Sequence, residues 1–241
     1  MKVPGAFAVG AASHTGRIRV NNEDDYLLGS HRPDRGELLL CAIADGMGGA
    51  AGGAEASRTA LRALGSTVLD GSDTRAVAAR LEVGFQRAAE RVFEQATAVP
   101  ALRGMGTTLT ALCLEPGHAS VGHIGDTRLY RLRGGGAEVL TTDHALREPD
   151  NVLLRCIGGG QVDCNPDFAA VETAVGDRFV LVTDGIWSVL TPARLGALGG
   201  RDTTQVAAEA LVAAALEAGG PDNATAVVVD VLTVAPSAGV K

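Results

Sequence analysis

Runs of apolar residues broken by polar turns divide the chain into predicted strands and helices. Residues 37–44 contain the nearly continuous apolar run LLLCAIA, which is typical of a strand buried on both faces. The turn sequences EPGH and RGGGAE separate further apolar runs. The same pattern predicts strands at 5–12, 25–30, 107–114, 118–124, 127–133, 137–141, 169–174, 178–183 and 224–233.

Apolar residues at helical spacing predict three helices. Two of them, at 53–69 and 73–96, follow each other directly, and Asp73 is the expected N-cap of the second. The third is expected at 202–218, where Asp202 and Gln205 have the spacing of a capping box and a pair of glycines follows. Helices grouped between runs of adjacent strands favour an α+β fold over alternating βαβ units.

The chain has 241 residues, no internal repeat and no recognisable linker. We therefore predict one domain over residues 1–233. Residues 234–241 are polar and contain glycine and proline, so we expect them to form a disordered tail.

Charge and cysteine usage exclude several classes of function. The formal net charge of -7 argues against a surface that holds nucleic acid or anionic lipid. No stretch approaches the roughly 18 apolar residues of a membrane helix, and the N-terminal residues favour a first strand over a signal peptide. The four cysteines form no CxxC pair, which favours buried reduced thiols in a cytoplasmic protein over a zinc or redox site.

Four aspartates lie at the ends of predicted strands: Asp45, Asp126, Asp184 and Asp222. The first three have glycine as an immediate neighbour, which would let a cation and its waters approach closely. A single Asp-Gly pair is usually only a turn. Several carboxylates at the ends of core strands, however, would be costly to bury without partners.

Arginine could neutralise these carboxylates, but only Arg128 and Arg178 lie close to any of them in sequence. Divalent cations with oxygen ligands are the other solution. Because aspartate is the repeated ligand type and no histidine cluster accompanies it, the pattern favours Mg²⁺ or Mn²⁺ over Zn²⁺.

Eight stretches, from about residue 8 to 232, carry a family resemblance. They are RVNNEDD (19–25), IADGMGG (43–49), GMGTTLTAL (104–112), GHIGDTRLYRL (122–132), LTTDHAL (140–146), NVLLRCIGG (151–159), DRFVLVTDGIW (177–187) and PDNATAVVV (221–229). In this order they resemble the metal-dependent Ser/Thr protein phosphatases of the protein phosphatase 2C type, in their compact bacterial form. Any one stretch alone would be weak evidence.

The resemblance implies a four-layer αββα sandwich of two packed antiparallel sheets flanked by helix pairs. It also implies two bound Mn²⁺ or Mg²⁺ ions between the strand ends at one edge. Asp45 would bridge both ions, and the Gly46 carbonyl would bind the second. Asp184 and Asp222 would complete the first ion's shell, and Asp126 with Asp184 would hold a weaker third ion.

The remaining site residues are implied in the same way. Glu23 and Asp24 would orient metal-bound waters, with Asn223 in a similar outer position. Arg19 would clamp the substrate phosphate. The implied reaction is hydrolysis of phosphoserine and phosphothreonine in proteins by a metal-bridged hydroxide, and the implied partners are a Ser/Thr kinase or its targets.

Two points of the site stay open. Arg17 is a candidate backup for Arg19, because alternate residues of a strand face the same side. Met47 stands where many family members carry a histidine thought to protonate the leaving group, which leaves the general acid unassigned. His14 and His123 are candidates, a structural role is preferred for His144, and a metal-bound water is the preferred donor.

Function and cleft shape also leave alternatives. Only ALREPD separates His144 from Asn151. The helical flap of bacterial relatives is therefore reduced almost to a turn, and we expect an open, shallow cleft. A pseudophosphatase that serves as a regulatory binding module is the alternative to an enzyme. A phosphatase for anti-sigma-factor antagonists would use the same chemistry on another substrate.

Overall fold

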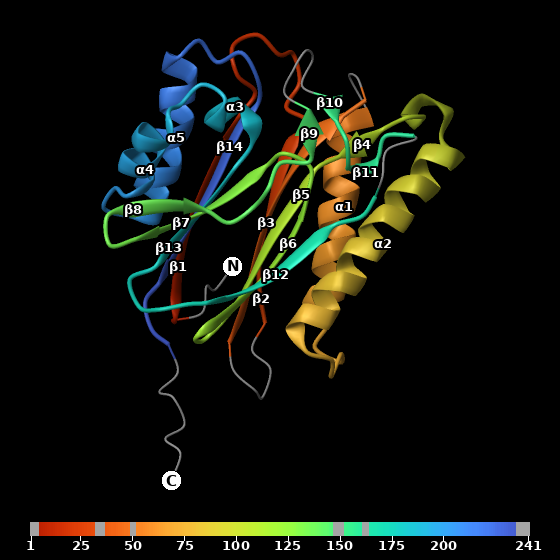
Figure 1. The fold of residues 1–241 in the computed structure, drawn as a ribbon. Coiled ribbons are helices and arrows are strands. Elements are labelled where there is room, and N and C mark those ends of the chain that lie inside the picture. Colours follow the sequence, from red (N-terminus) through yellow and green to blue (C-terminus); the bar gives the residue numbers. More distant parts are fainter. Residues whose placement is uncertain (1–4, 32–36, 49–51, 147–151, 161–163, 235–241) are drawn as a thin grey trace.

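Two antiparallel β-sheets pack face to face in a computed structural model that describes residues 5–31, 37–48, 52–146, 152–160 and 164–234 (Figure 1). Five strands form the first sheet, in the order β1 (Phe7–His14), β14 (Ala224–Val231), β13 (Arg178–Val182), β7 (Arg128–Arg133) and β8 (Gly136–Val139). Strand β1 pairs with β14 over its full length, from Phe7 opposite Val231 to His14 opposite Ala224.

The second sheet has seven strands. Its order is β11 (Ile157–Gly158), β4 (Gly106–Thr107), β3 (Leu38–Met47), β5 (Leu109–Glu115), β6 (His118–Ile124) and β12 (Asp167–Glu172), with β2 (Asp24–His31) also paired to β3. A separate two-stranded sheet joins β9 (Ala145–Leu146) to β10 (Val152–Leu153). The residues between β9 and β10, on which the shortened flap was expected, lie outside the described residues.

Helices cover the outer face of each sheet (Figure 1). The pair α1 (Gly52–Val68) and α2 (Val77–Ala98) packs on the second sheet, while α4 (Pro192–Gly199) and α5 (Thr204–Glu217) pack on the first. Two short elements, α3 (Asp184–Trp187) and the 3₁₀ turn η1 (Pro100–Leu102), complete the helices.

Three buried clusters lie between these layers. One joins the α1–α2 pair to the second sheet, one fills the space between the sheets, and one joins the first sheet to α4 and α5. Large side chains such as Phe85 and Phe179 are almost completely buried in the outer and central clusters. The α+β prediction is confirmed, and the stacking of the clusters gives the order helix, sheet, sheet, helix.

Every predicted strand and helix is present, with ends that differ by a few residues. The largest difference at the candidate site concerns β3, which was predicted to end at residue 44 but continues to Met47. Gly46 and Met47 pair with Thr107 and Gly106 of the two-residue strand β4, so Asp45 lies inside a strand and not in a glycine turn. Both α3 and α4 were missed.

Both predicted N-caps were wrong, whereas α5 ends just before the predicted glycine pair. Helix α2 begins at Val77 without a side-chain cap, and Asp73 instead accepts the backbone N–H of Arg75 at 2.9 Å. Thr203, not Asp202, caps α5 by accepting the N–H of Val206. The Gln205 amide accepts the N–H and donates to the carbonyl of Ala11, because β1 is an edge strand whose outer backbone groups need partners.

The first turn of α5 rests directly on β1 at Gly10. A Cβ added at Gly10 would overlap the backbone of Thr204 and Gln205, so only glycine allows this close approach. The contact places α5 over the edge of the first sheet.

Two remaining expectations concern the ends of the chain and membranes. None of the helices in the described ranges is long and apolar enough to cross a membrane. The expected tail at 234–241 lies almost entirely outside the described residues, which end at residue 234. It stays a prediction, as does the domain boundary.

Gly10→Ala should destabilise the chain by about 1–3 kcal/mol, because the added methyl group must push α5 away from β1. Urea unfolding at equilibrium measures the change. Gly5→Ala is the matched control, since a Cβ there meets no atom within 4 Å, and it should stay within about 0.5 kcal/mol of the parent. Equal stability of the two variants would show that α5 does not need this contact.

Candidate metal centre

A cleft of about 840 Å³ opens where the ends of several strands meet, and it gathers residues that are far apart in the sequence. Eight of the predicted site residues line it: Arg19, Glu23, Asp45, Gly46, Asp126, Asp184, Asp222 and Asn223. Asp24 is the one predicted site residue that does not line the cleft. The fold therefore brings the four predicted carboxylates and the predicted phosphate-binding arginine to one place.

The backbone of Asp45 is held on both sides by threonines. Its N–H donates to Thr108 Oγ1 at 2.9 Å. Its carbonyl accepts from Thr107 Oγ1 at 3.0 Å and from the Thr108 N–H at 2.9 Å. Burial and four neighbouring carboxylates raise the pKa of Asp45 well above its ordinary value. The carboxyl group is thus rigidly placed in surroundings that disfavour its negative charge.

Asp184 is the first residue of α3, directly after β13. Burial and the charge of Asp222 raise its pKa, and a hydrogen bond with Asp45 lowers it in part. Its Oδ1 atom is buried and has no hydrogen-bond partner among the described residues. Two carboxyl groups at hydrogen-bond distance require a proton or a cation between them, so this pair is suited to share a cation.

Asp126 lies in the turn between β6 and β7 and is 8% exposed. Its carbonyl accepts the Trp187 Nε1–H at 3.0 Å. Burial, together with the charges of Asp184 and Asp143, raises the pKa of Asp126 to about 7. Gly125 precedes it with φ = 108°, and a Cβ there would contact Thr108 at 2.5 Å. Glycine is therefore required at the turn that presents Asp126.

Asp222 lies just before β14 and forms an ion pair with Arg19. The Arg19 guanidinium donates to Asp222 Oδ2 at 2.8 Å, and the arginine side chain is 55% exposed. Asp222 raises the pKa of Arg19 most strongly, and Asp184 and Asp45 add to the effect. Arg19 thus stands at the exposed side of the carboxylate cluster, where it can meet an anionic ligand from solvent.

Asn223 fixes the loop that carries Arg19. Its Oδ1 accepts the Glu23 N–H at 2.8 Å, and its Nδ2 donates to the carbonyls of Thr15 and Asn21 at 2.8 and 2.9 Å. Three hydrogen bonds from one buried side chain therefore position the loop between β1 and β2.

Glu23 and Gly46 meet the start of α1. The Glu23 carbonyl accepts from Ser57 Oγ at 2.8 Å and from the Gly46 N–H at 3.2 Å. A Cβ at Gly46 would overlap the Gly53 carbonyl, and a Cβ at Gly53 would overlap the Glu23 carboxylate. A similar overlap with the Asn223 carbonyl excludes a Cβ at Gly185. We expected glycine to give a cation access, whereas these glycines let protein segments pack closely enough to bring the carboxylates together.

Asp24 lies beneath the cleft and joins the two sheets. Its Oδ2 accepts from Thr183 Oγ1 at 2.8 Å and from Thr225 Oγ1 at 2.7 Å. Burial raises the pKa of Asp24 to about 7. Asp24 belongs to the second sheet and both threonines to segments of the first, so the network ties the sheets together under the site. Its expected role in orienting water stays a prediction.

The backup role of Arg17 rested on a strand that does not exist. Residues 15–23 form a loop, and Arg17 Nε donates to the Leu216 carbonyl at 3.0 Å, in the last turn of α5. Arg17 does not line the cleft. His14, a candidate general acid, binds its own loop, because its Nδ1 accepts the Gly16 N–H at 2.9 Å.

The sequence did not single out several residues that shape the site. Thr107 and Thr108 hold the backbone of Asp45, Thr183 and Thr225 donate to the Asp24 carboxylate, and Trp187 donates to the Asp126 carbonyl. All five lie inside the family-like stretches GMGTTLTAL, DRFVLVTDGIW and PDNATAVVV, which was the available signal. Which residues these five side chains contact could not be predicted from the sequence.

The donor set fits a hard divalent cation such as Mn²⁺ or Mg²⁺. Every candidate ligand is an oxygen, one of them (Asp184 Oδ1) is buried without a partner among the described residues, and the pKa values of three cleft aspartates are raised. No three His, Cys, Asp or Glu side chains in the described ranges already converge as a finished metal site. In this form Asp222 is paired with Arg19, and Asp45 is hydrogen-bonded to Asp184.

Comparison with known proteins finds relatives among bacterial protein phosphatases. A family model described as protein phosphatase 2C matches residues 13–218. The serine/threonine protein phosphatase PstP of Mycobacterium tuberculosis is 33% identical over 92% of this chain, and this chain spans 44% of its length. The protein phosphatase PhpP of Streptococcus pneumoniae is 30% identical over 89% of this chain and 93% of its own.

Solved structures show the same architecture. The crystal structure of the M. tuberculosis serine/threonine phosphatase PstP/Ppp superposes with a TM-score of 0.84 at 30% identity, over 94% of this chain and 99% of that one. The PstP catalytic domain in complex with two manganese ions superposes with a TM-score of 0.82 at 31% identity, over 94% and 98% of the two chains.

Without metal, the chain should lose stability as the pH rises from about 4 to about 7. The folded state holds protons on Asp24 and Asp126 up to pH values near 7, whereas the unfolded chain releases them near 3.8. The unfolded state therefore binds fewer protons in this window, and the free energy of unfolding falls with rising pH. Saturating Mn²⁺ should reverse the trend, because metal replaces the protons.

Urea midpoints at pH 5 and pH 7, in EDTA and in Mn²⁺, measure this effect. Asp45→Asn removes one of the mutually repelling charges and should flatten the metal-free dependence. A metal-free stability that increases from pH 5 to pH 7 would contradict the carboxylate cluster as the main source of the pH dependence.

Proposed function

The chain belongs to the protein phosphatase 2C family, and on this premise we propose that it hydrolyses phosphoserine and phosphothreonine in proteins with the help of Mn²⁺ or Mg²⁺. The supporting observation is the gathering of Asp45, Asp126, Asp184 and Asp222 around one cleft that has Arg19 at its exposed side. Such a set of anionic oxygens beside an arginine suits cations that in turn receive a phosphate group.

Four aspartates and one carbonyl would hold the cations. In the proposed arrangement Asp45 serves two ions, Asp184 and Asp222 belong to the first, and the Gly46 carbonyl belongs to the second. Asp126 with Asp184 would hold a weaker third ion. Bound Mn²⁺ or Mg²⁺ supplies Lewis-acid charge and lowers the pKa of coordinated water toward neutrality.

The side chains divide the remaining work. Arg19 offers a planar fork of N–H donors to phosphoryl oxygens. Its ion pair with Asp222 would break when a cation binds that carboxylate, which would release the guanidinium for the phosphate. Asn223 keeps the loop of Arg19 in place. Glu23 lines the cleft, where its carboxylate would accept a hydrogen bond from a water held by the cations. Asp24 lies beneath the cleft and accepts a hydrogen bond from Thr183, the residue before Asp184.

The proton donor to the leaving group is not a histidine in this proposal. None of the histidines within the described ranges lines the cleft. His123 has both ring nitrogens engaged, and burial and the nearby His144 lower its pKa to about 4. A water held by the cations would be the preferred donor.

A regulatory pseudophosphatase is the less favoured alternative. A binding module has no need to keep four carboxylates together, three of them with pKa values raised by burial and neighbouring charges, yet all four line the cleft of this chain. A phosphatase for anti-sigma-factor antagonists would share the same site chemistry and differ only in its phosphoprotein.

The finer assignments extend this proposal. A Ser/Thr kinase or its targets are the proposed partners. We place the activity in one catalytic domain of residues 1–233 and in the cytoplasm, where the thiols of Cys41, Cys113, Cys156 and Cys164, which form no disulfide, would stay reduced.

Asp184→Asn should abolish metal-dependent release of phosphate from a phosphothreonine peptide. The change removes a charge proposed to serve two cation sites, so the loss should exceed the roughly 100-fold that loss of an outer contact costs. Phosphate release with and without Mn²⁺ measures it. The exposed Asp202→Asn is the matched control and should keep full activity. No hydrolysis by the folded parent with either Mn²⁺ or Mg²⁺ would instead favour the binding module.

Arg19→Ala should have opposite effects on catalysis and on metal binding. Loss of the phosphate contact should lower kcat/KM by about 100-fold. Loss of the ion pair to Asp222 should tighten Mn²⁺ binding, because one competing cation has gone. Steady-state kinetics and calorimetric Mn²⁺ titration measure the two effects. Arg17→Ala, which removes a contact to α5, should change neither value, and equal effects of both variants would refute the assignment.

A further inference from the structure

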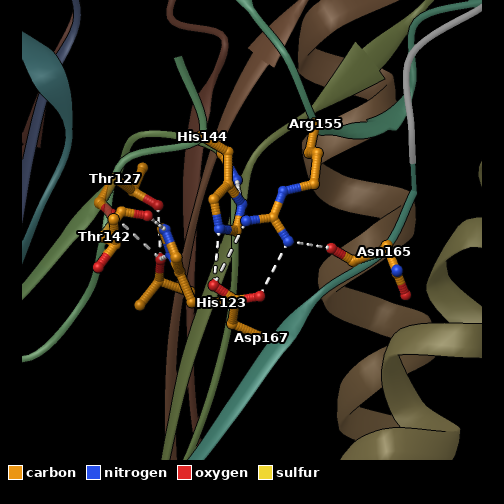
Figure 2. A network of polar contacts seen from close by, with 9 residues as sticks. His123, Thr127, Thr142, His144, Arg155, Asn165 and Asp167 are labelled. Carbon is orange, nitrogen blue, oxygen red and sulfur yellow. Dashed lines mark hydrogen bonds and ion pairs between the residues drawn. The ribbon is translucent and has the colours of Figure 1, made fainter.

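His144 is buried, does not line the cleft, and has every polar atom engaged. Its side chain is 1% exposed. Figure 2 shows its ring between His123 and Arg155, with Asp167 bonded to its outer nitrogen. Its carbonyl accepts from the backbone N–H groups of Leu154 and Arg155 at 2.8 and 3.4 Å. A histidine with no free atom and no exposed surface acts on its neighbours and not on a ligand.

Two of those contacts go to the residue before Asp126. The His144 backbone N–H donates to the Gly125 carbonyl at 2.7 Å, and the Gly125 N–H donates to His144 Nδ1 at 3.2 Å. Both hydrogen-bonding groups of Gly125 are therefore bound by one residue. Because the Gly125 N–H can only donate, Nδ1 must be unprotonated and the ring proton must lie on Nε2.

Asp167 and His123 hold the ring in that state. His144 Nε2 lies 2.9 Å from Asp167 Oδ2, so it donates there, and Arg155 donates to the other carboxylate oxygen at 2.8 Å. The His123 ring packs against His144 with a centroid distance of 4.8 Å. The carboxylate therefore selects the tautomer that keeps Nδ1 available for Gly125 (Figure 2).

The neighbour of His144 supports the same turn from another side. Asp143 binds Arg128 through two hydrogen bonds of 2.9 and 2.8 Å. Arg128 in turn lies 3.7 Å from the ring centroid of Trp187, whose N–H holds the Asp126 carbonyl. The consecutive residues Asp143 and His144 thus act, directly or through one intermediate, on the backbone of Gly125 and Asp126.

We propose that His144, with its tautomer set by Asp167, is a positioning residue that aims the Asp126 carboxylate at the third cation site. This inference rests on the proposed function, since it assigns Asp126 to a cation. The same residue also anchors the segment that follows β10, and Val152 and Leu153 of that strand line the cleft. His144 therefore couples the position of one carboxylate to one wall of the cleft.

Two nearly isosteric replacements separate the two ring nitrogens. His144→Asn carries an amide oxygen at the distance of Nδ1 from Cβ, so it can still accept from Gly125 and loses only Asp167. His144→Gln carries an amide nitrogen near the place of Nε2, so it can still donate to Asp167 and loses Gly125. If His144 served only the stability of the fold, both variants should have similar effects on Mn²⁺ binding. If His144 positions Asp126, only the variant that lacks an acceptor for the Gly125 N–H should weaken Mn²⁺ binding.

The measurement is calorimetric titration of the full chain with Mn²⁺, with thermal unfolding recorded for each variant. We expect His144→Gln to weaken the weakest Mn²⁺ site about 10-fold and His144→Asn to stay near the parent. The tighter sites should be unchanged in both variants. His118→Asn, at the exposed opposite end of β6, is the matched control and should bind as the parent does.

A double-mutant cycle with Asp126→Asn tests the route of the effect. Once Asp126 is neutral, adding His144→Gln should cause no further loss of Mn²⁺ affinity, because both changes act on the same site. If His144→Gln does not fold, Asp167→Ala alters the same ring from a half-exposed position and should weaken the same site.

The outcomes distinguish the inference from the function on which it rests. Equal Mn²⁺ affinities for parent, His144→Gln and Asp167→Ala, or only two sites in the parent, would overturn the positioning role while phosphatase activity persists. Additive losses in the double-mutant cycle would overturn it as well. A parent chain that binds no Mn²⁺ and releases no phosphate would overturn the proposed function itself.

Discussion

Mutual repulsion among Asp45, Asp126, Asp184 and Asp222 is the constraint around which the site is built. Burial, together with the charges of neighbouring carboxylates, raises the pKa values of Asp45, Asp126 and Asp184. A chain that must hold them together without metal relies on protons, on the hydrogen bond between Asp45 and Asp184, and on the ion pair of Asp222 with Arg19. A divalent cation bound to the carboxylates could take the place of each of these three interactions.

The surrounding structure resists this repulsion through backbone contacts. Threonines hold Asp45, a tryptophan and a histidine hold the Asp126 turn, and Asn223 holds the loop of Arg19. Glycines 46, 53, 125 and 185 permit approaches that any Cβ would block. The carboxylates are therefore placed by rigid main chain, which is the condition for a site that binds metal without rearranging.

The site also lies at the interface between the two sheets. Asp24 of the second sheet accepts hydrogen bonds from Thr183 and Thr225 of the first, directly under the cleft. Thr225 in turn contacts Ser13 of β1 at 2.8 Å. The geometry of the site therefore depends on how the sheets pack. A change that shifts one sheet against the other would also shift Asp45 relative to Asp184.

The sequence by itself predicted the α+β class, the order of the longer strands and helices, and eight of the residues that line the cleft, because apolar periodicity and short motifs are local signals. It did not determine that β3 runs past Asp45, since that depends on pairing with Thr107 about 60 residues away. Nor did it reveal that Arg17 donates to the Leu216 carbonyl in α5 or that His144 holds Gly125. Those are contacts between distant segments, and only the packed tertiary structure decides which distant donor meets which acceptor.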